Sequence, residues 1–389
     1  MSNILNLLSE ETFAAKMDMQ NALLAAIAAQ SGGLTISSWS DVQQLVRLGL
    51  ASKLFSIGDQ FLCNRGEDTF VWDIIGIDHD TPTDKTKTHS MTLQLHDCFT
   101  GSLQYNARGA LYYAQTQLAA GTYNFTCKGR TDYTADNDKT FQFTLASAVP
   151  AGGQIVVEAN QNQALAGKTV KTYSSAESTS TIETTTLSEG SAGTSLGSTD
   201  GTADQVNHIQ RVVWASNNWE KSAIRQLLNS AAEAGNVWIP QSDFDRPPTW
   251  AETTEGFLRG VDADFLAVLG TVDKTTARSS LDGEGSDILE EKIWLPSVTE
   301  VFGGQNGDVD EGTAYAYYAD NSDLSVPGKG ADRNRIKYKH ENGAEAIYWW
   351  LRSASVSNAG QSYAVHPAGQ ASVTYPQSGL RISPACCIV

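Results

Sequence analysis

Residue types that bind metal ions occur together at two places in this chain. Residues 78–80 (Asp-His-Asp) and 96–98 (His-Asp-Cys) offer carboxylate, imidazole and thiol groups, which are the usual ligands of zinc. Their spacing matches no zinc pattern, and neighbouring residues of a strand point to opposite faces, so these groups would diverge. A solvated loop beside the end of a strand is the simpler explanation, and we expect neither a metal ion nor a cofactor.

Three carboxylates in a second segment, Asp308, Asp310 and Glu311, could supply oxygen ligands to a calcium ion. Acidic surface loops are commoner than calcium sites, so we interpret the segment as a surface loop. A structural calcium ion stays open as the alternative.

The five cysteines, Cys63, Cys98, Cys127, Cys386 and Cys387, form neither an even extracellular set nor a Cys-x-x-Cys pair. We therefore expect buried free thiols. Cys386 and Cys387 are adjacent, so they would point to opposite faces of a strand and could not form an ordinary disulfide without strain. No adjacent basic residue would lower the pKa of these two thiols.

The C-terminal tail has the most unusual composition of the chain, because no Asp, Glu, Lys or Arg occurs from Ser353 to Leu380. Residues 348–353 (Tyr-Trp-Trp-Leu-Arg-Ser) and 379–389 flank this stretch with aromatic and β-branched residues that suit a buried sheet. The small, amide and tyrosine side chains between them can contact a partner without matching its charge. The pattern predicts a rigid scaffold that presents an uncharged surface.

Within this stretch, apolar residues alternate on either side of residues 367–369 (Pro-Ala-Gly), which predicts a β-hairpin. We expect Tyr363 and Tyr375 to contact a ligand, because tyrosine offers a large contact area at low entropy cost. Cross-strand packing inside the hairpin is the alternative. Three tyrosines of an earlier loop could extend the same surface: Tyr315, Tyr317 and Tyr318.

Four residues around this stretch are assigned to the scaffold: Trp349, Trp350, Arg352 and Arg381. Trp349 and Trp350 would face opposite sides of a regular strand, so one belongs to the core. The other either forms the floor of the binding surface or also lies in the core. We expect Arg352 to bind a carboxylate or carbonyl oxygen of the protein, as buried guanidinium groups usually do.

Composition and charge argue against two classes of function. The chain has 389 residues, 41% of them hydrophobic, which is enough for about two or three domains with real cores. A formal net charge of −17 without a basic stripe argues against nucleic-acid binding. No run of about eighteen apolar residues could cross a membrane, and the first residues lack the pattern of a signal peptide. We expect synthesis in the cytoplasm of the producing cell and no membrane insertion.

Two helices are predicted near the N-terminus. Residues 10–30 place apolar side chains at helical spacing, and this stripe could be buried only against another chain or a neighbouring part. Residues 38–50 form a second helix with Ser38 as N-cap. Its inward face consists of Val42, Leu45, Val46 and Leu48. We interpret both helices as elements of attachment or oligomerisation.

Strand patterns follow. Residues 57–63, 70–77 and 91–95 are predicted strands, and residues 64–68 form a hairpin turn between the first two. From about residue 111 the chain has short strands separated by polar turns, which predicts a small all-β module. These strands cover residues 121–126, 140–145 and 154–157.

The remaining sequence combines a polar segment with mixed structure. Residues 174–204 are dominated by Ser, Thr and Gly and can bury little apolar area, so we interpret them as an arm or edge ribbon. Helices are predicted at residues 219–232 and 261–272. Residues 292–297 and the segment around Trp349 are predicted strands.

The order of these elements resembles the C-type lectin fold in its formylglycine-generating-enzyme-like branch. Members of that branch often carry a Trp-Leu-Arg-Ser strand and end on a strand that returns to pair with the first. The matching segments are residues 70–77, the helix 219–229 with Ser222, Arg225, Leu228 and Asn229, and residues 293–297, 349–353 and 379–388. The resemblance covers roughly residues 55–110 and 205–389.

The resemblance implies an α+β fold in which a C-type-lectin-like domain is interrupted by an all-β insertion and preceded by N-terminal helices. The expected parts are a helical attachment region (1–54), the first part of the lectin-like domain (55–110), the β module with its Ser/Thr/Gly-rich arm (111–204), and the remainder with a variable C-terminal face (205–389).

A narrower resemblance is to phage fibre proteins of this fold and to the variable proteins of diversity-generating retroelements. In those systems a reverse transcriptase mutates template adenines, so asparagine codons become codons for other residues. Gln361, Gln370 and Gln377 would need lysine codons in the template. Twelve residues are of types reachable from an asparagine codon and are the implied ligand-binding set: Ser355, Ser357, Asn358, Ala359, Tyr363, Val365, His366, Ala368, Ser372, Thr374, Tyr375 and Ser378.

Two other activities of the fold lack their sequence signatures in this chain. Its best-known catalytic member oxidises a substrate cysteine and needs a well-placed cysteine pair, which Cys386-Cys387 in an apolar strand does not supply. Calcium-dependent lectins use Glu-Pro-Asn, Gln-Pro-Asp or Trp-Asn-Asp tripeptides, and none is present. We therefore expect no catalytic residues, and the missing tripeptides leave any sugar specificity in doubt.

The resemblance implies a non-catalytic adhesin of a phage virion that binds a bacterial surface protein or glycan. Other virion proteins would bind its N-terminal region, and a homo-oligomer, by analogy a trimer, would multiply weak single sites. The alternative is a structural virion protein, such as a capsid decoration or fibre joint, without ligand recognition.

Overall fold

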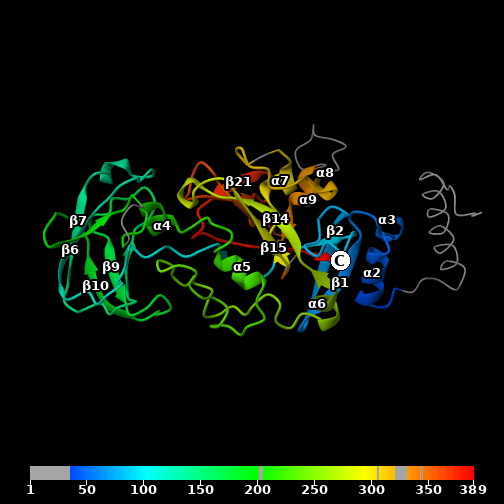
Figure 1. The fold of residues 1–389 in the computed structure, drawn as a ribbon, viewed down its shortest axis with the longest axis horizontal. Coiled ribbons are helices and arrows are strands. Elements are labelled where there is room, and N and C mark those ends of the chain that lie inside the picture. Colours follow the sequence, from blue (N-terminus) through cyan, green and yellow to red (C-terminus); the bar gives the residue numbers. More distant parts are fainter. Residues whose placement is uncertain (1–35, 201–204, 305, 320–330, 342, 344) are drawn as a thin grey trace, which may run out of the picture.

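A computed structural model describes residues 36–200, 205–304, 306–319, 331–341, 343 and 345–389 (Figure 1). The fold is α+β, as expected: most elements are strands in several sheets, nearly all antiparallel, with a few short helices between them. The helix predicted at residues 10–30 lies outside the described residues.

The largest sheet has the order β1-β2-β3-β23-β13, with β16 also pairing β23. Strands β1, β2 and β3 lie where strands were predicted at residues 57–63, 70–77 and 91–95, but β1 begins at Gln60 and runs to Arg65, so the hairpin turn is shorter than the predicted 64–68. The resemblance implied that the last strand pairs with the first, but β23 pairs with β3. All four residues of β23 are buried, as a central strand requires. The bounds are β1 Gln60–Arg65, β2 Asp68–Ile77, β3 Met91–Leu95, β13 Leu269–Gly270, β16 Ile293–Trp294 and β23 Ala385–Ile388.

Helix α2 (Trp39–Arg47) confirms the helix predicted after Ser38. The Ser38 side chain accepts a hydrogen bond from the backbone of Asp41, and the Asp41 carboxylate accepts one from the backbone of Ser38, which closes a capping box. Val42, Leu45 and Val46 are buried. Leu48 is 57% exposed, so its predicted inward position is wrong, because it follows the last helical residue. Helix α3 (Ala51–Leu54) comes next.

The two helices predicted after residue 205 are shorter than expected. Helix α5 (Ala223–Leu228) begins only after Ser222, whose hydroxyl caps the backbone N–H of Arg225 at 3.1 Å. Helix α6 (Ala263–Val268) ends where the chain enters β13 and pairs with β23, so sheet formation overrides the helical pattern there. Further short helices are α7 Val298–Phe302, α8 Ala316–Ala319 and α9 Ala331–Arg335, and Thr134–Asp136 and Ser280–Asp282 form 3₁₀ turns.

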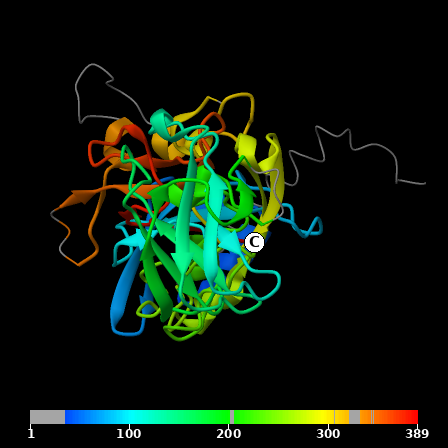
Figure 2. The same ribbon diagram turned by 90° about the vertical axis from the view of Figure 1, so that its left-hand side faces the viewer.

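Residues 111–214 form a β module with its own hydrophobic core, at one end of the long axis (Figures 1 and 2). Two sheets of orders β10-β9-β8-β5 and β11-β7-β6-β12 contribute to this core together with α4 (Ile209–Trp214). Strands β10, β11 and β12, from the Ser/Thr/Gly-rich segment, lie at sheet edges. The module strands are β5 Tyr112–Tyr113, β6 Gly121–Thr126, β7 Thr140–Leu145, β8 Gln154–Glu158, β9 Thr169–Tyr173, β10 Thr181–Thr186, β11 Ser188–Glu189 and β12 Thr194–Ser198.

The remaining strands belong to the larger core, which takes residues from both sides of the module in sequence. Strands β19, β20 and β21 form one small sheet, and the described residues also contain three separate strand pairs, β14·β15, β17·β18 and β4·β22. Their bounds are β4 Leu103–Gln104, β14 Val272–Ala277, β15 Ser286–Glu291, β17 Lys337–Tyr338, β18 Ala346–Ile347, β19 Trp349–Ala354, β20 Ser362–Val365, β21 Ala371–Thr374 and β22 Gly379–Leu380.

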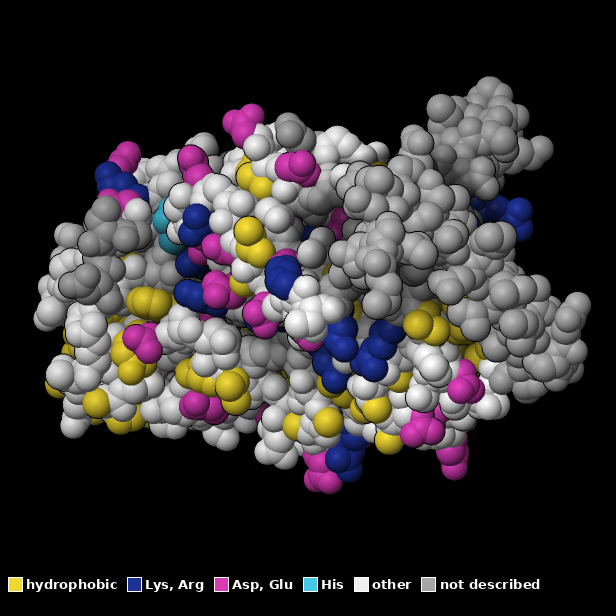
Figure 3. All heavy atoms as spheres, turned by 45° about the vertical axis from the view of Figure 1, so that its right-hand side comes forward, with side chains coloured by type: hydrophobic (Ala, Val, Ile, Leu, Met, Phe, Trp, Pro, Cys, Tyr) yellow, Lys and Arg dark blue, Asp and Glu magenta, His cyan; other side chains and the backbone are white. Residues whose placement is uncertain are grey.

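No helix of the described residues is long and apolar enough to cross a lipid bilayer. Acidic and basic side chains are interspersed on the face of the molecule shown in Figure 3.

All five cysteines are buried free thiols, as predicted. Burial raises the pKa of the Cys63 and Cys127 thiols to about 12. We expect a thiol reagent such as 5,5′-dithiobis(2-nitrobenzoate) to label the folded protein very slowly and all five thiols after denaturation, because only the thiolate reacts. Rapid labelling of one thiol in the native protein would show that its strand opens locally.

Candidate functional site: the C-terminal hairpin and its buried support

Strands β20 and β21 form the predicted hairpin, with Tyr363 paired to Val373. The turn is closed by two backbone hydrogen bonds of 2.8 Å between His366 and residues Gln370 and Gly369. Gly369 has a φ of 80°, a conformation that glycine adopts without strain. Strand β21 lies at the edge of its sheet, next to β20, which separates it from β19.

The structure places the twelve predicted ligand-binding residues in three different environments. Ser357 and Ala368 are exposed. Seven are half-buried: Asn358, Tyr363, His366, Ser372, Thr374, Tyr375 and Ser378. The other three are buried, with exposed fractions of 6% for Ser355, 7% for Ala359 and 0% for Val365. The prediction that these three contact a partner is wrong, because a bound molecule could not reach their side chains.

The loop before β20 is held by one side chain from the segment that leaves the β module. The amide nitrogen of Asn217 donates to the carbonyl oxygens of Ser355 at 3.4 Å, Asn358 at 3.3 Å and Gln361 at 2.8 Å. The two N–H groups of this amide are shared among three carbonyl oxygens, which ties the loop to the segment that carries Asn217.

The two tyrosines expected to contact a ligand have different surroundings. The Tyr375 ring packs 4.7 Å from the Trp214 ring of α4, so it joins the hairpin to the β module. Tyr363 is half-buried and lies on the same hairpin face as Val373, which is 40% exposed. Of the two, Tyr363 with its cross-strand neighbour is the better placed to meet a partner.

The aromatic residues near the hairpin belong to the core. Trp349 and Trp350 are both 0% exposed, and their indole nitrogens donate to the carbonyl oxygens of Arg335 and Leu103. The alternative in which both lie in the core is therefore confirmed. The proposal that three tyrosines extend the binding surface is wrong, because all of them are buried: Tyr315, Tyr317 and Tyr318.

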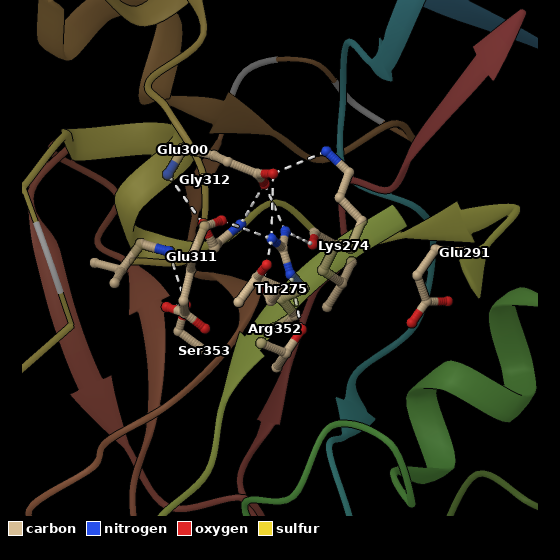
Figure 4. Close-up of polar contacts among 12 residues, drawn as sticks. Lys274, Thr275, Glu291, Glu300, Glu311, Gly312, Arg352 and Ser353 are labelled. Carbon is tan, nitrogen blue, oxygen red and sulfur yellow. Dashed lines mark hydrogen bonds and ion pairs between the residues drawn. The ribbon is translucent and has the colours of Figure 1, made fainter. Parts of the chain in front are cut away.

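Arg352, on strand β19, lies at the centre of a buried ion cluster (Figure 4). Its guanidinium group binds the Glu300 carboxylate through both oxygens, at 2.5 and 3.1 Å. It also donates to the hydroxyl of Thr276 at 3.2 Å. Three backbone carbonyls accept further bonds at 3.1 Å each, those of Leu295, Thr275 and Glu311. The prediction that Arg352 binds a carboxylate or carbonyl oxygen is confirmed.

Lys274 extends the cluster on the other side of Glu300. Its ammonium group binds a Glu300 oxygen and the Tyr315 hydroxyl, both at 2.8 Å, and forms an ion pair with Asp80. It also lies 4.6 Å from the centre of the Trp294 ring. Burial alone would raise the pKa of Glu300, but Arg352 and Lys274 outweigh it and lower the pKa to about 2.

Glu311 completes the cluster and is the buried exception in a segment that is otherwise the predicted surface loop. It is 0% exposed and accepts hydrogen bonds from the Ala277 backbone at 2.9 Å, from Asn306 at 3.2 Å and from Ser353 at 2.5 Å. Burial raises the pKa of Glu311. Asp308 and Asp310 are exposed, so the three carboxylates do not converge.

The two segments with metal-ligand residue types also diverge. Asp80 pairs with Lys274, whereas His96 contacts Asp73 at 2.8 Å. Among the residues that the structure describes, no three His, Cys, Asp or Glu side chains are grouped to hold a metal ion.

Arg381, the fourth scaffold residue, supports β19 from the opposite end. It pairs with Glu341 at 2.5 Å, and its carbonyl accepts a hydrogen bond from the Trp350 backbone at 2.9 Å. Sequence reasoning missed Lys274, Glu300 and Asp80 as parts of the scaffold. The only local signal was Ser297 followed three residues later by Glu300, a capping box that the structure contains at the start of α7.

Residues 196–389 match the model of a domain of unknown function, DUF6273. The matched region begins within β12 and contains the hairpin, Lys274, Glu300, Glu311 and Arg352. Comparison with curated proteins and comparison with solved structures gave no match. The part of the chain that carries the candidate site is thus similar to the DUF6273 domain.

Proposed function

We propose that this protein is a non-catalytic receptor-binding protein of a phage particle. In this proposal the C-terminal hairpin binds a protein or glycan on a bacterial surface. The virion setting and the diversification of the gene rest on the sequence resemblance. A homo-oligomer would let weak single sites act together.

The observation that supports binding is that the uncharged hairpin β20-β21 lies at the edge of its sheet and pairs with β19, a strand whose side chains are held by the buried cluster. No charged residue occurs between Ser353 and Leu380, and the β21 side chains are all exposed or half-buried. Strand β19, which pairs with β20, carries Arg352 and Ser353, and both side chains are fixed by the buried cluster. A rigid support limits the ordering entropy lost on binding, so small polar contacts can produce useful affinity.

For the fold, we propose a C-type-lectin-like domain interrupted by the β module. The larger core draws on residues 42–105 and 219–389, and the second core draws on residues 111–214. The chain therefore leaves the first core, completes the module and returns, which is the arrangement of an inserted unit.

We expect Val373→Lys to weaken binding of the labelled protein to intact bacterial cells by roughly tenfold or more, because the new ammonium group would be buried unpaired against the partner. Binding is measured by flow cytometry over a panel of bacterial isolates with the unlabelled protein as competitor. Val373 is 40% exposed, so the monomer accommodates the lysine.

Leu62→Lys provides the matched control, since Leu62 is a 65% exposed apolar residue of β1, in a different sheet. It should bind cells like the unmodified protein. Equal binding by both variants would refute the hairpin as the contact surface, and absence of competed binding to every isolate would favour a structural virion component.

A further inference from the structure

A pocket of about 460 Å³ lies between the β module and the larger core. Its walls come from the segments 106–109, 206–211, 216–221, 238–246 and 280–282, together with Asp200. The volume is within the range of small-molecule sites, and the hairpin strands contribute no residue to the lining.

The walls of this junction pocket are fixed by contacts between the β module and segments that follow it in the chain. The Gln154 amide of β8 donates to the carbonyl oxygens of Asp243 and Asp245 at 2.7 and 3.0 Å. Arg246 donates to the carbonyl oxygen of Ser178 at 2.7 Å, and Arg211 of α4 pairs with Asp282 across the pocket. The cavity is therefore preorganised, which reduces the cost of binding a ligand.

Charges in the pocket balance. Among the described residues of the lining, three cationic side chains, Arg211, Lys221 and Arg246, face three carboxylates, Asp200, Asp245 and Asp282. Burial and Arg211 lower the pKa of His208, so its ring is neutral at neutral pH. A phosphate or other strongly charged group would meet a carboxylate for every cation, so the pocket favours a neutral ligand.

Three hydrogen-bond donors at the pocket have no partner among the residues that the structure describes: the ammonium group of Lys221 and the amide nitrogens of Asn207 and Asn218. The amide oxygens of these asparagines are used, since they accept the backbone N–H groups of His208 at 2.9 Å and Lys221 at 3.1 Å. Asn218 is only 7% exposed, so its unused amide nitrogen needs a ligand or water. The aromatic rings of Trp238 and Phe244 also line the pocket.

We propose that the junction pocket binds a neutral saccharide of one or two residues. Hydroxyl groups of a sugar accept hydrogen bonds from Asn207, Asn218 and Lys221. The apolar face of the sugar ring packs on the aromatic ring of Trp238 or Phe244. Balanced charge, directional amide donors and aromatic surface occur together here, and this combination suits a hydroxyl-rich ligand better than an anion or a hydrocarbon. The site is separate from the hairpin, so the protein would have two recognition surfaces.

The test uses saturation-transfer NMR and calorimetry on the full chain with D-glucose, D-galactose, D-mannose, N-acetyl-D-glucosamine, L-rhamnose and their disaccharides, and with D-glucuronate as the charged comparator. The variant Asn207→Asp/Asn218→Asp keeps both structural acceptor oxygens and removes both free donors. We expect it to weaken saccharide binding about tenfold, as the loss of two hydrogen bonds predicts. Ser280→Trp, at an exposed lining position, should block the pocket and abolish binding. Asn236→Asp, in an exposed turn outside the lining, is the matched control and should bind like the parent.

Binding of a neutral sugar that is lost in both pocket variants and kept in Asn236→Asp supports the proposal. No binding of any neutral saccharide by the folded protein, preference for D-glucuronate, or binding that survives both pocket changes would overturn it. The readout needs no cells, so failure of the hairpin to bind bacteria would leave this result unaffected.

Discussion

Replacement of Arg352 by methionine is expected to lower the free energy of unfolding by about 3–5 kcal/mol, the range found when one partner of a buried ion pair is removed. Methionine keeps much of the aliphatic volume but leaves the Glu300 carboxylate without its bidentate partner. The carbonyl oxygens of Thr275, Leu295 and Glu311 lose their donors at the same time. Urea denaturation followed by tryptophan fluorescence measures the change.

Arg259→Met provides the matched control. Arg259 pairs with Glu233 and Glu255, but these side chains are 41%, 70% and 49% exposed, so the loss should stay below about 1 kcal/mol. If Arg352→Met and Arg259→Met lowered the free energy of unfolding by the same amount, the buried cluster would not be what stabilises β19. Glu300→Gln should cost less in the Arg352→Met background than alone, because the two residues form one interaction.

Local elements were predictable because each depends on neighbours in sequence. The capping box of Ser38 and Asp41, the pattern of β3 and the Pro-Ala-Gly turn of the hairpin all act over a few residues, and all are present. The helix predicted at residues 261–272 was too long. Residues 269–270 leave the helix and form β13 because they pair with β23, which is distant in sequence.

The ion cluster could not be predicted in this way. Lys274 is separated in sequence from Glu300 by 26 positions and from Asp80 by 194, and Arg352 from Glu300 by 52. Nothing local distinguishes Glu311, which is buried, from exposed Asp310 in the same acidic loop. The three tyrosines from Tyr315 to Tyr318 were assigned to the surface because the pattern of a loop does not reveal what covers it.

The hairpin shows the same limit. The alternation of apolar residues predicted the two strands of the hairpin. It did not show which of their side chains are covered by other parts of the chain. Val365 is buried beside β19, and Tyr375 packs on Trp214 of a module distant in sequence. The surface available to a partner is therefore smaller than the one that the twelve predicted residues would form. It is centred on Tyr363, Val373 and the turn.

Acidification is expected to remove a large part of the stability of this protein below about pH 4.5. In the folded protein the pKa of Glu300 is lowered from 4.5 to about 2, and that of Asp73 from 3.8 to about 2. For Asp73, burial acts to raise the pKa, but hydrogen bonding to His96 and the nearby Lys337 outweigh it. Depressed carboxylate pKa values give stability that is complete above the unfolded values and is lost as pH falls toward 2.

A shift from 4.5 to about 2 corresponds to roughly 3 kcal/mol for Glu300. The free energy of unfolding, measured by urea denaturation at pH 7, 5, 4 and 3, should fall steeply over the two lowest steps. Asp73→Asn should flatten the fall, because the amide cannot titrate. If the free energy of unfolding of Asp73→Asn fell with pH as steeply as that of the parent, Asp73 would not contribute to the pH dependence.

Two other buried carboxylates act in the opposite direction. Burial raises the pKa of Glu311 and of Glu291, which accepts hydrogen bonds from Trp219 and Arg225 at 2.8 Å each. The folded protein takes up these protons before the unfolded chain does, so the free energy of unfolding should rise slightly as pH falls toward the ordinary value of 4.5. The expected curve thus has a shallow maximum above pH 4.5, and Glu311→Gln should lower that maximum. Stability that kept rising down to pH 3 would mean that desolvation, rather than the Arg352 and Lys274 ion pairs, dominates the charge state of the cluster.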